Sequence, residues 1–285
     1  MSITATVDHY ENFPVASLLC PARLRPAVRA IYAYARTADD LADEGAHGAA
    51  ERLARLAAYE ADLHAVAAGR APSGEWPAVF GPLAQVLRDF RLPVALLADL
   101  LSAFRQDVVQ HDYADRAQLL DYCRRSADPV GRLVLHLHGV ADAASLARSD
   151  DICSALQLAN FWQDLGVDTA RGRLYAPLAD CRRHAVAPAA LLRGQADAGL
   201  DALLCELCGW ARALMLRGAP LVHRLGGRAG WELRLVVQGG LAILERCDRL
   251  GARLLGERPA VGAVDLPRLA WRAFAMGGRQ EDGPA

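Results

Sequence analysis

Two polar segments inside long helical stretches constrain this chain more than any other feature of its sequence. Their polar residues are Asp39, Asp40 and Asp43 in the first and Asn160, Asp164 and Asp168 in the second. The surrounding sequence is rich in Ala and Leu, with apolar residues at helical spacing. Residues four positions apart on a helix are neighbours, about 5–6 Å apart at Cβ. Each segment is therefore expected to present its carboxylates on one helix face.

Carboxylates that face one another inside a helical bundle need a counter-charge. Burying an ionised carboxylate is costly unless a cation lies beside it, and Mg²⁺ takes oxygen ligands at about 2.0–2.1 Å while keeping positions for substrate phosphate. The two segments together therefore predict a metal-bridged diphosphate site between two helices. Either segment alone is explained as well by a solvated acidic surface. Their joint occurrence, with Asn160 where a surface helix more often carries Lys, Glu or Arg, favours the site.

The composition favours helices over sheets. Hydrophobic residues make up 53% and aromatic residues 6% of the 285 residues, and the β-branched and aromatic residues typical of strands are sparse. We therefore expect an all-α fold in which 1–285 form a single domain, with an N-terminal arm at 1–20 and a frayed tail at 277–285. Asp128, before Pro129, is expected to cap a helix. The expected helices span about 22–44, 49–68, 80–90, 94–109, 116–126, 128–140, 145–168, 199–217, 228–250 and 267–276.

Charge and cysteine content limit the expected partners and compartment. The formal net charge of −1 offers no reason to expect nucleic acid or an anionic membrane as a partner. The seven Cys are scattered and the chain opens without a secretory signal, which indicates a reducing compartment. The longest apolar runs are too short to cross a bilayer. We therefore expect a cytoplasmic protein, and peripheral contact with the inner face of the membrane is left open.

Two arginines follow the second acidic segment closely. The sequence contains no Lys, so any phosphate contact falls to Arg, His or the backbone. Arg171 and Arg173 belong to a loop of about 171–177, and the planar guanidinium of arginine matches the oxygens of a phosphate. The loop is therefore expected to close on a diphosphate. A solvated basic loop is the alternative.

Three motifs occur in order along the chain. They are Arg36-x-x-Asp39-Asp40-x-x-Asp43, then Tyr122-Cys123 before a broken helix with Val130-Gly131, then Asn160-x-x-x-Asp164-x-x-x-Asp168 followed by Arg173-x-Tyr175-x-Pro177. This ordered set resembles the squalene/phytoene synthase family of isoprenoid enzymes, from the N-terminal arm to about residue 275. Either acidic motif alone is a weak signal, whereas the ordered set is specific.

The resemblance implies an isoprenoid-synthase helical bundle with a central cavity, in which an allylic diphosphate ionises to a carbocation. It implies that two or three Mg²⁺ ions are bound by Asp39, Asp40 and Asp43 on one side and by Asn160, Asp164 and Asp168 on the other, with Asp39 and Asp164 also acting in catalysis. It further implies that Tyr122 lies at the reaction centre. The residues implied to contact substrate are Arg36, Phe13, Tyr34, Asn160, Arg171, Arg173 and Tyr175.

Two departures from the family pattern indicate a branch. Gln163 precedes Asp164 where the family commonly has Arg, and Ser126-Ala127-Asp128-Pro129 replaces a Val-Ala-Gly type of break. With the opening Tyr10-Glu11-Asn12-Phe13-Pro14-Val15-Ala16-Ser17, they look most like the hydroxysqualene synthase branch of bacterial hopanoid pathways. That branch ionises presqualene diphosphate, rearranges the cation and captures it with water. Gln163 is then expected to act in catalysis by orienting that water, because an amide both donates and accepts hydrogen bonds; packing at the helix end is the alternative.

Other functions remain open at this point. Within the class, the alternative is a presqualene diphosphate or squalene synthase that condenses two farnesyl diphosphates. A helical scaffold protein would keep the fold without the chemistry, but its sequence mark would be lost aspartates, and here all of them are present. The sequence contains no nucleotide-binding fingerprint, which agrees with a reaction that needs no NADPH. We expect presqualene diphosphate or farnesyl diphosphate as substrate, action beside other squalene-pathway enzymes, and no nucleic acid partner.

Overall fold

The computed structural model describes residues 20–278, and in that range the chain is helical and contains no strand. An isolated bridge between Asp112 and Leu174 is the one pairing of strand type within it. The prediction of an all-α fold is confirmed. The expected N-terminal arm and most of the expected tail lie outside the described residues, and the single-domain expectation stays a prediction. Among residues 20–278, no helix combines the length and the apolar character that a membrane span requires.

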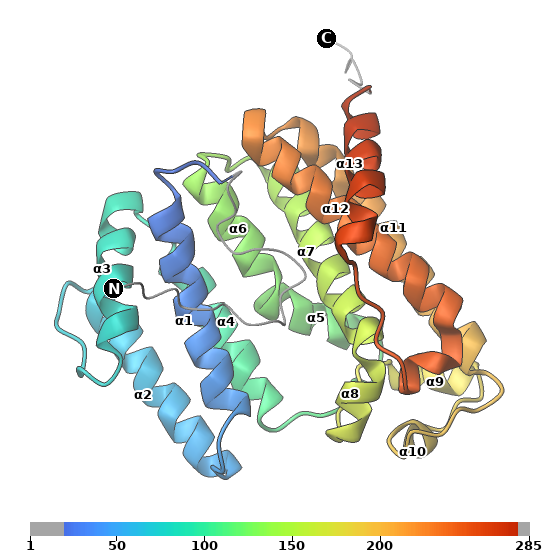
Figure 1. The fold of residues 1–285 in the computed structure, drawn as a ribbon. Helices are drawn as coiled ribbons and strands as arrows, with labels where there is room; N and C mark the ends of the chain where they lie inside the picture. Colours follow the sequence, from blue (N-terminus) through green and yellow to red (C-terminus); the bar gives the residue numbers. More distant parts are fainter. Residues whose placement is uncertain (1–19, 279–285) are drawn as a thin grey trace.

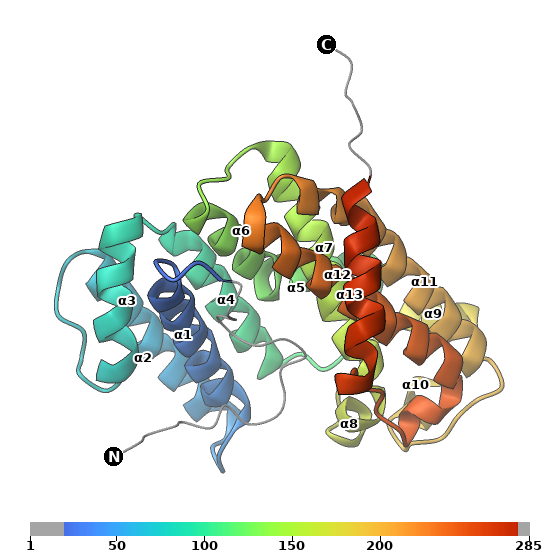
Figure 2. The ribbon, with the colours of Figure 1, turned by 45° about the horizontal axis from the view of Figure 1, so that its top comes forward.

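The first four helices form one side of the molecule (Figures 1 and 2). They are α1 (Arg25–Asp43), α2 (Ala49–Ala67), α3 (Pro77–Phe90) and α4 (Val94–Asp107). Their inward faces bury an apolar cluster that contains the contacting rings of Tyr34, Tyr59 and Phe80. Helices of this length are marginal in isolation, so burial of this apolar area, at about 25 cal/mol per Å², holds them in place.

The other helices continue across to the far side, with α5, α6 and α7 between the first four and α11–α13 (Figures 1 and 2). The α-helices are α5 (Arg116–Ser126), α6 (Asp128–Leu137), α7 (Ala143–Gln163), α8 (Leu165–Ala170), α9 (Leu178–Arg183), α10 (Pro188–Leu191), α11 (Leu200–Gly218), α12 (Gly227–Leu250) and α13 (Leu266–Ala275). Short 3₁₀ helices are η1 (Ala219–His223), η2 (Gly251–Leu255), η3 (Ala263–Asp265) and η4 (Met276–Gly278).

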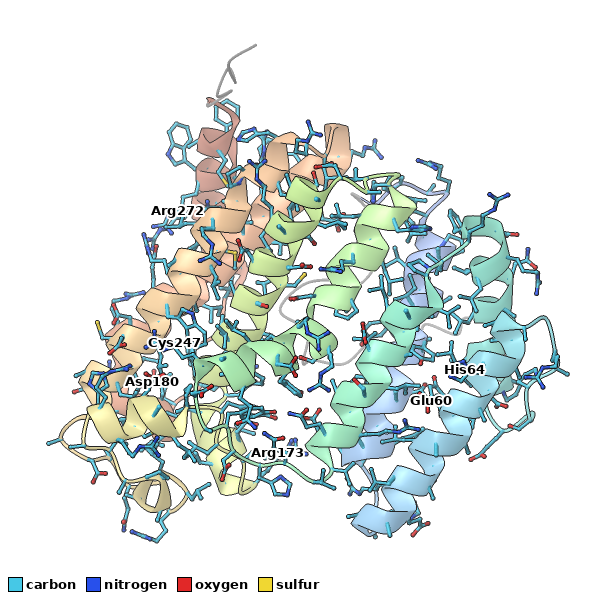
Figure 3. All side chains as sticks on the ribbon, turned by 180° about the vertical axis from the view of Figure 1, so that it is seen from behind. Glu60, His64, Arg173, Asp180, Cys247 and Arg272 are labelled. Carbon is cyan, nitrogen blue, oxygen red and sulfur yellow. The ribbon has the colours of Figure 1, made fainter. Side chains whose placement is uncertain are left out.

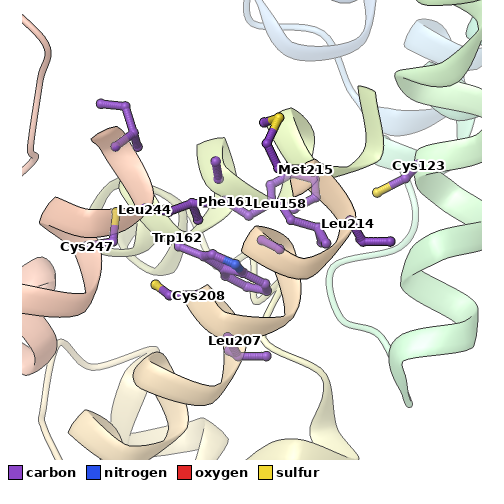
Figure 4. Packing of buried hydrophobic residues seen from close by; sticks show 14 of the residues in the cluster. Cys123, Leu158, Phe161, Trp162, Leu207, Cys208, Leu214, Met215, Leu244 and Cys247 are labelled. Carbon is purple, nitrogen blue, oxygen red and sulfur yellow. The ribbon is translucent and has the colours of Figure 1, made fainter. Parts of the chain in front are cut away.

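A second apolar cluster holds this larger group of helices together. Its centre lies where α7 packs extensively on α11. Trp162 of α7 is fully buried there, among Leu207, Cys208 and Leu244 (Figure 4). The large indole ring therefore anchors the C-terminal end of α7, from which the second acidic segment emerges.

The approach of α6 to α7 depends on a glycine. A Cβ at Gly131 on α6 would lie 2.4 Å from Ser149 Oγ and 2.5 Å from Cys153 Sγ on α7. No side chain fits at that distance, so glycine allows the two helices to pack closely. This contact positions α7 beside the helices that carry the candidate site.

One helix division and one helix cap differ from the sequence-based expectation. The helix expected over 145–168 is divided, because α7 ends at Gln163 and α8 begins at Leu165, with Asp164 at the joint. The expectation that Asp128 caps α6 is wrong: Ala127 occupies the N-cap, and the Asp128 carboxylate accepts a hydrogen bond from Ser154 Oγ at 2.9 Å. A partner on α7, distant in sequence, thus replaces the local capping interaction.

Candidate active site

The first acidic segment lies at the C-terminal end of α1, beside a hollow of about 550 Å³. Asp39 and Asp43 are one helical turn apart and both line this hollow. The full lining consists of Arg36, Asp39, Asp40, Asp43, Glu44, His111, Arg171 and Arg173. The hollow therefore combines carboxylates with guanidinium groups from α1 and from the loop after α8, and we call it the acidic hollow.

Arg36 pairs with acidic residues of its own helix. Its guanidinium nitrogens lie 2.8 Å from Asp40 Oδ1, 3.2 Å from Glu44 Oε1 and 3.5 Å from Asp39 Oδ2. Exposed ion pairs of this kind contribute little stability, so the guanidinium can turn toward an anion in the acidic hollow at small cost. Its expected contact with diphosphate stays a prediction.

The second acidic segment keeps its helical register across the joint between α7 and α8. The Asp164 backbone N–H donates to the Asn160 carbonyl at 2.8 Å, and the Asp168 N–H donates to the Asp164 carbonyl at 2.8 Å. These are the spacings of an uninterrupted α-helix. Asn160, Asp164 and Asp168 therefore remain in helical succession although the helix is divided, and Asn160 is exposed.

Arg173 joins the two acidic segments. Its guanidinium forms a two-point ion pair with Asp43, in which Nη1 lies 2.9 Å from Oδ2 and Nη2 contacts Oδ1. Its backbone N–H donates to the Asp168 carbonyl at 2.9 Å. Figure 3 shows Arg173 near α8, at the end of the molecule opposite to Arg272. The structure thus brings the predicted arginine loop onto the carboxylates, and Arg171 lines the same hollow.

Burial and the charges of neighbouring groups change the pKa values of these carboxylates. Burial, with Asp43 close by, raises the pKa of Asp39 to about 6. Burial, with Asp164 and Asp43 close by, raises the pKa of Asp168 to about 7. Burial also acts to raise the pKa of Asp43, but the ion pair with Arg173 outweighs it and holds that pKa below its usual value. Since Asp168 on α8 responds to the charge of Asp43 on α1, the two segments face a common space.

These donors fit a hard divalent cation by their chemistry. A cation favours the ionised form of carboxylates whose pKa values are raised by burial and by neighbouring carboxylates, and Asp39 and Asp168 supply one such group from each segment. Within residues 20–278, no group of three or more His, Cys, Asp or Glu side chains is arranged to hold a metal ion. Asp43 is paired with Arg173 and Asp164 with Arg258. Binding of Mg²⁺ by both segments therefore requires these ion pairs to open, and the magnesium assignment stays a prediction.

Three aromatic rings surround Tyr122, which is buried on α5. The ring centroid of Tyr122 lies 5.5 Å from that of Tyr113, 6.1 Å from Phe161 and 6.3 Å from Tyr175. Tyr175 also stacks on Phe161, with centroids 3.7 Å apart and planes inclined by 6°. The structure brings together the predicted residues Tyr122 and Tyr175. It adds Tyr113 and Phe161, which the motif spacing did not single out.

Asp107, at the end of α4, is a candidate catalytic residue that sequence reasoning missed. The Tyr122 hydroxyl donates to its Oδ2 at 2.9 Å, and its Oδ1 has no hydrogen-bond partner among the described residues. Burial raises the pKa of Asp107 to about 7, against the opposing effect of the Tyr122 hydrogen bond. A carboxyl group with such a pKa can exchange protons near neutral pH. The sequence signal was weak, because Asp107 is simply one polar residue near the end of an expected helix.

Gln163 does not point to the acidic hollow. Its Nε2 donates to the Pro259 carbonyl at 2.6 Å, and the side chain is buried. The adjacent Asp164 pairs with Arg258 of the same loop. This placement supports the packing alternative and not a position beside metal ions, so the water-orienting assignment of Gln163 is corrected here. Gln163 and Asp164 together hold the loop 256–262 against the joint between α7 and α8.

We expect Gln163→Leu to destabilise the folded protein by about 1–3 kcal/mol, because the buried Pro259 carbonyl loses its donor. Urea unfolding measures the effect. Gln195→Leu replaces an exposed glutamine away from this loop and should change the free energy of unfolding little. An unchanged unfolding midpoint for Gln163→Leu would show that the hydrogen bond to Pro259 does not hold the loop.

Of the residues expected to contact substrate, one is placed in the core and another lies outside the described residues. Tyr34 is fully buried, its hydroxyl donates to the Leu97 carbonyl at 3.1 Å, and its ring stacks on Tyr59. Five residues of helix separate Tyr34 from Asp39, which turns the two side chains well away from one another. The assignment of Tyr34 to the substrate site is therefore wrong, and the residue belongs to the core. Phe13 lies outside the described residues.

The chain is similar to proteins of one family. A family model described as Squalene/phytoene synthase matches residues 6–268. A hydroxysqualene synthase from Sinorhizobium fredii is 36% identical over 272 residues, which cover 94% of this chain and 87% of that protein. A phytoene synthase from Thermus thermophilus is 33% identical over 93% of this chain and 89% of that protein. The crystal structure of squalene synthase HpnC from Alicyclobacillus acidocaldarius matches with a TM-score of 0.78 at 38% identity, over 85% of this chain and 90% of that one.

Proposed function

The chain belongs to the squalene/phytoene synthase family, and from this premise we propose that it is a hydroxysqualene synthase. It has the isoprenoid-synthase fold and is an enzyme of that class. The proposed reaction ionises presqualene diphosphate, rearranges the carbocation and captures it with water. The observation that carries the proposal is the hydrogen bond from Tyr122 to Asp107, which supplies a proton acceptor inside an aromatic cluster next to the acidic residues.

The leaving diphosphate belongs in the acidic hollow. Arg36, Arg171 and Arg173 line it, and their guanidinium groups donate to phosphate oxygens in fixed directions. Mg²⁺, bound by Asp39, Asp40, Asp43, Asn160, Asp164 and Asp168, would neutralise the charge that grows on the diphosphate. Arg173 changes partner in this scheme, because its guanidinium leaves Asp43 for the diphosphate. Each arginine thereby stabilises the charge that develops in the transition state.

The carbocation belongs against the aromatic cluster. A cation over an aromatic face gains about 0.5–2 kcal/mol, and the cluster supplies the rings of Tyr122, Phe161 and Tyr175. Water then forms the new C–O bond and must lose one proton. We assign the Asp107 carboxylate as the acceptor, because its Oδ1 has no partner among the described residues. No electron is gained or lost in this step, so no reductant is required.

A condensing enzyme is the second candidate. The Thermus thermophilus phytoene synthase matches nearly as much of this chain at a similar identity. A presqualene diphosphate or squalene synthase that joins two farnesyl diphosphates belongs to the same class of reaction. Condensation requires two diphosphate substrates, whereas the proposed reaction requires one. The independence from NADPH, the cytoplasmic location and the action beside other squalene-pathway enzymes stay predictions.

The test supplies presqualene, farnesyl and geranylgeranyl diphosphate separately to purified protein with Mg²⁺ and without NADPH. The proposal expects hydroxysqualene from presqualene diphosphate, with one diphosphate released for each product, and expects no change when NADPH is added. Mass spectrometry identifies the lipid. Presqualene diphosphate or phytoene as the only product, from farnesyl or geranylgeranyl diphosphate respectively, would assign the chain to the condensing class instead.

A further inference from the structure

The last helix, α13, has apolar residues on two opposite faces. Leu269 and Ala273 are buried against the rest of the molecule. The opposite face carries four exposed residues at helical spacing, which we call the aromatic ridge: Pro267, Ala270, Trp271 and Phe274. Trp271 is 72% exposed and Phe274 is 66% exposed, and their rings stack with centroids 6.3 Å apart.

The polar residues of α13 do not cover this ridge. They are Arg268 and Arg272, which lie 3.1 and 2.8 Å from the carboxylate of Glu245 on α12. A helix that faces only water normally presents charged side chains opposite its buried face. Exposed patches of large apolar residues mark contact surfaces. The aromatic ridge therefore has the composition of a surface that is covered when the protein functions.

A hollow of about 740 Å³ with a basic lining reaches the end of α13 at Arg272, Ala275 and Met276. Its ionisable lining residues are Arg148, Arg212, His223, Arg224, Arg272 and a single acid, Glu245. Glu245 is already shared by Arg212, Arg268 and Arg272. Arg224 lies 3.5 Å from Asp142, whereas Arg148 has no ion-pair or hydrogen-bond partner among the described residues. The basic hollow therefore carries excess positive charge and suits anionic groups.

We propose that the aromatic ridge and the basic hollow dock this protein on a bilayer that contains anionic phospholipid. Trp271 and Phe274 enter the boundary between headgroups and acyl chains, where amphipathic aromatic rings are favoured. The arginines of the basic hollow meet the lipid phosphates. The net charge of −1 did not predict this basic surface, because the carboxylates of the acidic hollow lie apart from the arginines near α13.

Other occupants fit this face less well. A second copy of the chain would form a two-fold interface that brings the same patch of each copy together, so the two basic hollows would approach one another. The residues that follow the described range are Arg279-Gln280-Glu281-Asp282-Gly283-Pro284-Ala285, and they offer no large apolar side chain to cover the ridge. Figure 3 shows Arg272 well apart from Arg173, which lines the acidic hollow, so the docking surface and the acidic hollow are separate.

Vesicle flotation of the full chain tests the docking surface. The protein is expected to float with phosphatidylcholine vesicles that contain phosphatidylglycerol, and less with phosphatidylcholine alone or at high salt. Trp271→Ala/Phe274→Ala should lower the affinity roughly tenfold or more, because two exposed rings are removed. Leu192→Ala is the matched control, since Leu192 is an exposed leucine of another region. Flotation that is equal for wild type and the double variant, or absent with both vesicles, would overturn the proposal.

Charge and ring insertion are tested separately. Arg148→Gln/Arg224→Gln should weaken flotation on the phosphatidylglycerol vesicles roughly fivefold or more, whereas Arg193→Gln, at an exposed arginine elsewhere, should not. Trp271→Phe should still float but lose the blue shift of tryptophan fluorescence that vesicles cause in wild type. Sedimentation measures the oligomeric state. If wild type is a dimer and the Trp271→Ala/Phe274→Ala variant is a monomer, the ridge binds a second copy of the chain and the proposal is overturned. No substrate enters these assays, so their outcome does not depend on the proposed reaction.

Discussion

Asp39→Asn and Asp168→Asn should each lower turnover by roughly a hundredfold to a thousandfold, which is the size of effect that follows loss of one group stabilising a leaving anion. Asp43→Asn and Asp164→Asn should behave alike, since all four are expected metal ligands. Diphosphate release with saturating Mg²⁺ measures the rate. Asp89→Asn, at an exposed aspartate of α3, is the control and should retain full activity.

The same substitutions should not unfold the protein, and stability measurements separate the two effects. The folded pKa values of about 6 for Asp39 and about 7 for Asp168 lie above the ordinary value of 3.8. The folded state therefore binds more protons than the unfolded state between these values, so stability falls as pH rises through them. Asparagine cannot ionise and avoids this loss. In the presence of a chelator, the variants should resist urea better than wild type above pH 7, with no such gain below about pH 4.

Near-normal turnover in any two of the four variants would contradict the assignment of both segments to the diphosphate site. If the variants are much less stable than wild type above pH 7, the carboxylates do not destabilise the metal-free fold, and the electrostatic argument is wrong. The two measurements thus test the chemistry and the electrostatics of the site independently.

Asp107→Asn should reduce hydroxysqualene formation by roughly 10²–10⁴-fold, because a positioned proton acceptor contributes that much. Tyr122→Phe keeps the ring but removes the hydrogen bond that lowers the pKa of Asp107. The pKa of Asp107 should then rise, and the acidic limb of the pH–rate profile should move to higher pH. Tyr113→Phe removes a neighbouring hydroxyl that accepts a hydrogen bond from Gln106 and is not the donor to Asp107, and it should leave the limb in place. An unmoved limb in Tyr122→Phe would show that Asp107 is not the acceptor.

The ring of Tyr122 has a separate expected role. Tyr122→Ala removes a face of the aromatic cluster and should lower turnover more than Tyr122→Phe does, by up to roughly thirtyfold if the ring stabilises a cation. Truncation of a buried aromatic ring also destabilises the fold, by about 3–5 kcal/mol, so the rates must be compared at a temperature where both variants are folded. Equal losses in the two variants would assign the role to the hydroxyl instead.

Local sequence patterns predicted most of the helices and the faces that they present. Apolar spacing located α2 and α5 almost to the residue, because amphipathic periodicity is a local property. The acidic residues at spacing i, i+4 kept that spacing even where the helix divides, since the hydrogen bonds from Asn160 through Asp164 to Asp168 continue across the joint. The ordered motifs also identified the family before any contact between them was known.

Contacts between side chains that are distant in sequence depend on how the helices pack. Arg173 pairs with Asp43 across 130 positions of sequence, and Gln163 bonds to Pro259 across 96. A local sequence pattern does not predict such contacts, because they depend on how whole helices pack against one another. For that reason the sequence did not predict that Asp107 contacts Tyr122. It also did not predict that Tyr34, five positions before Asp39, is buried in the core. Local periodicity predicts which face of each helix is buried, and packing between helices determines which residues that face contacts.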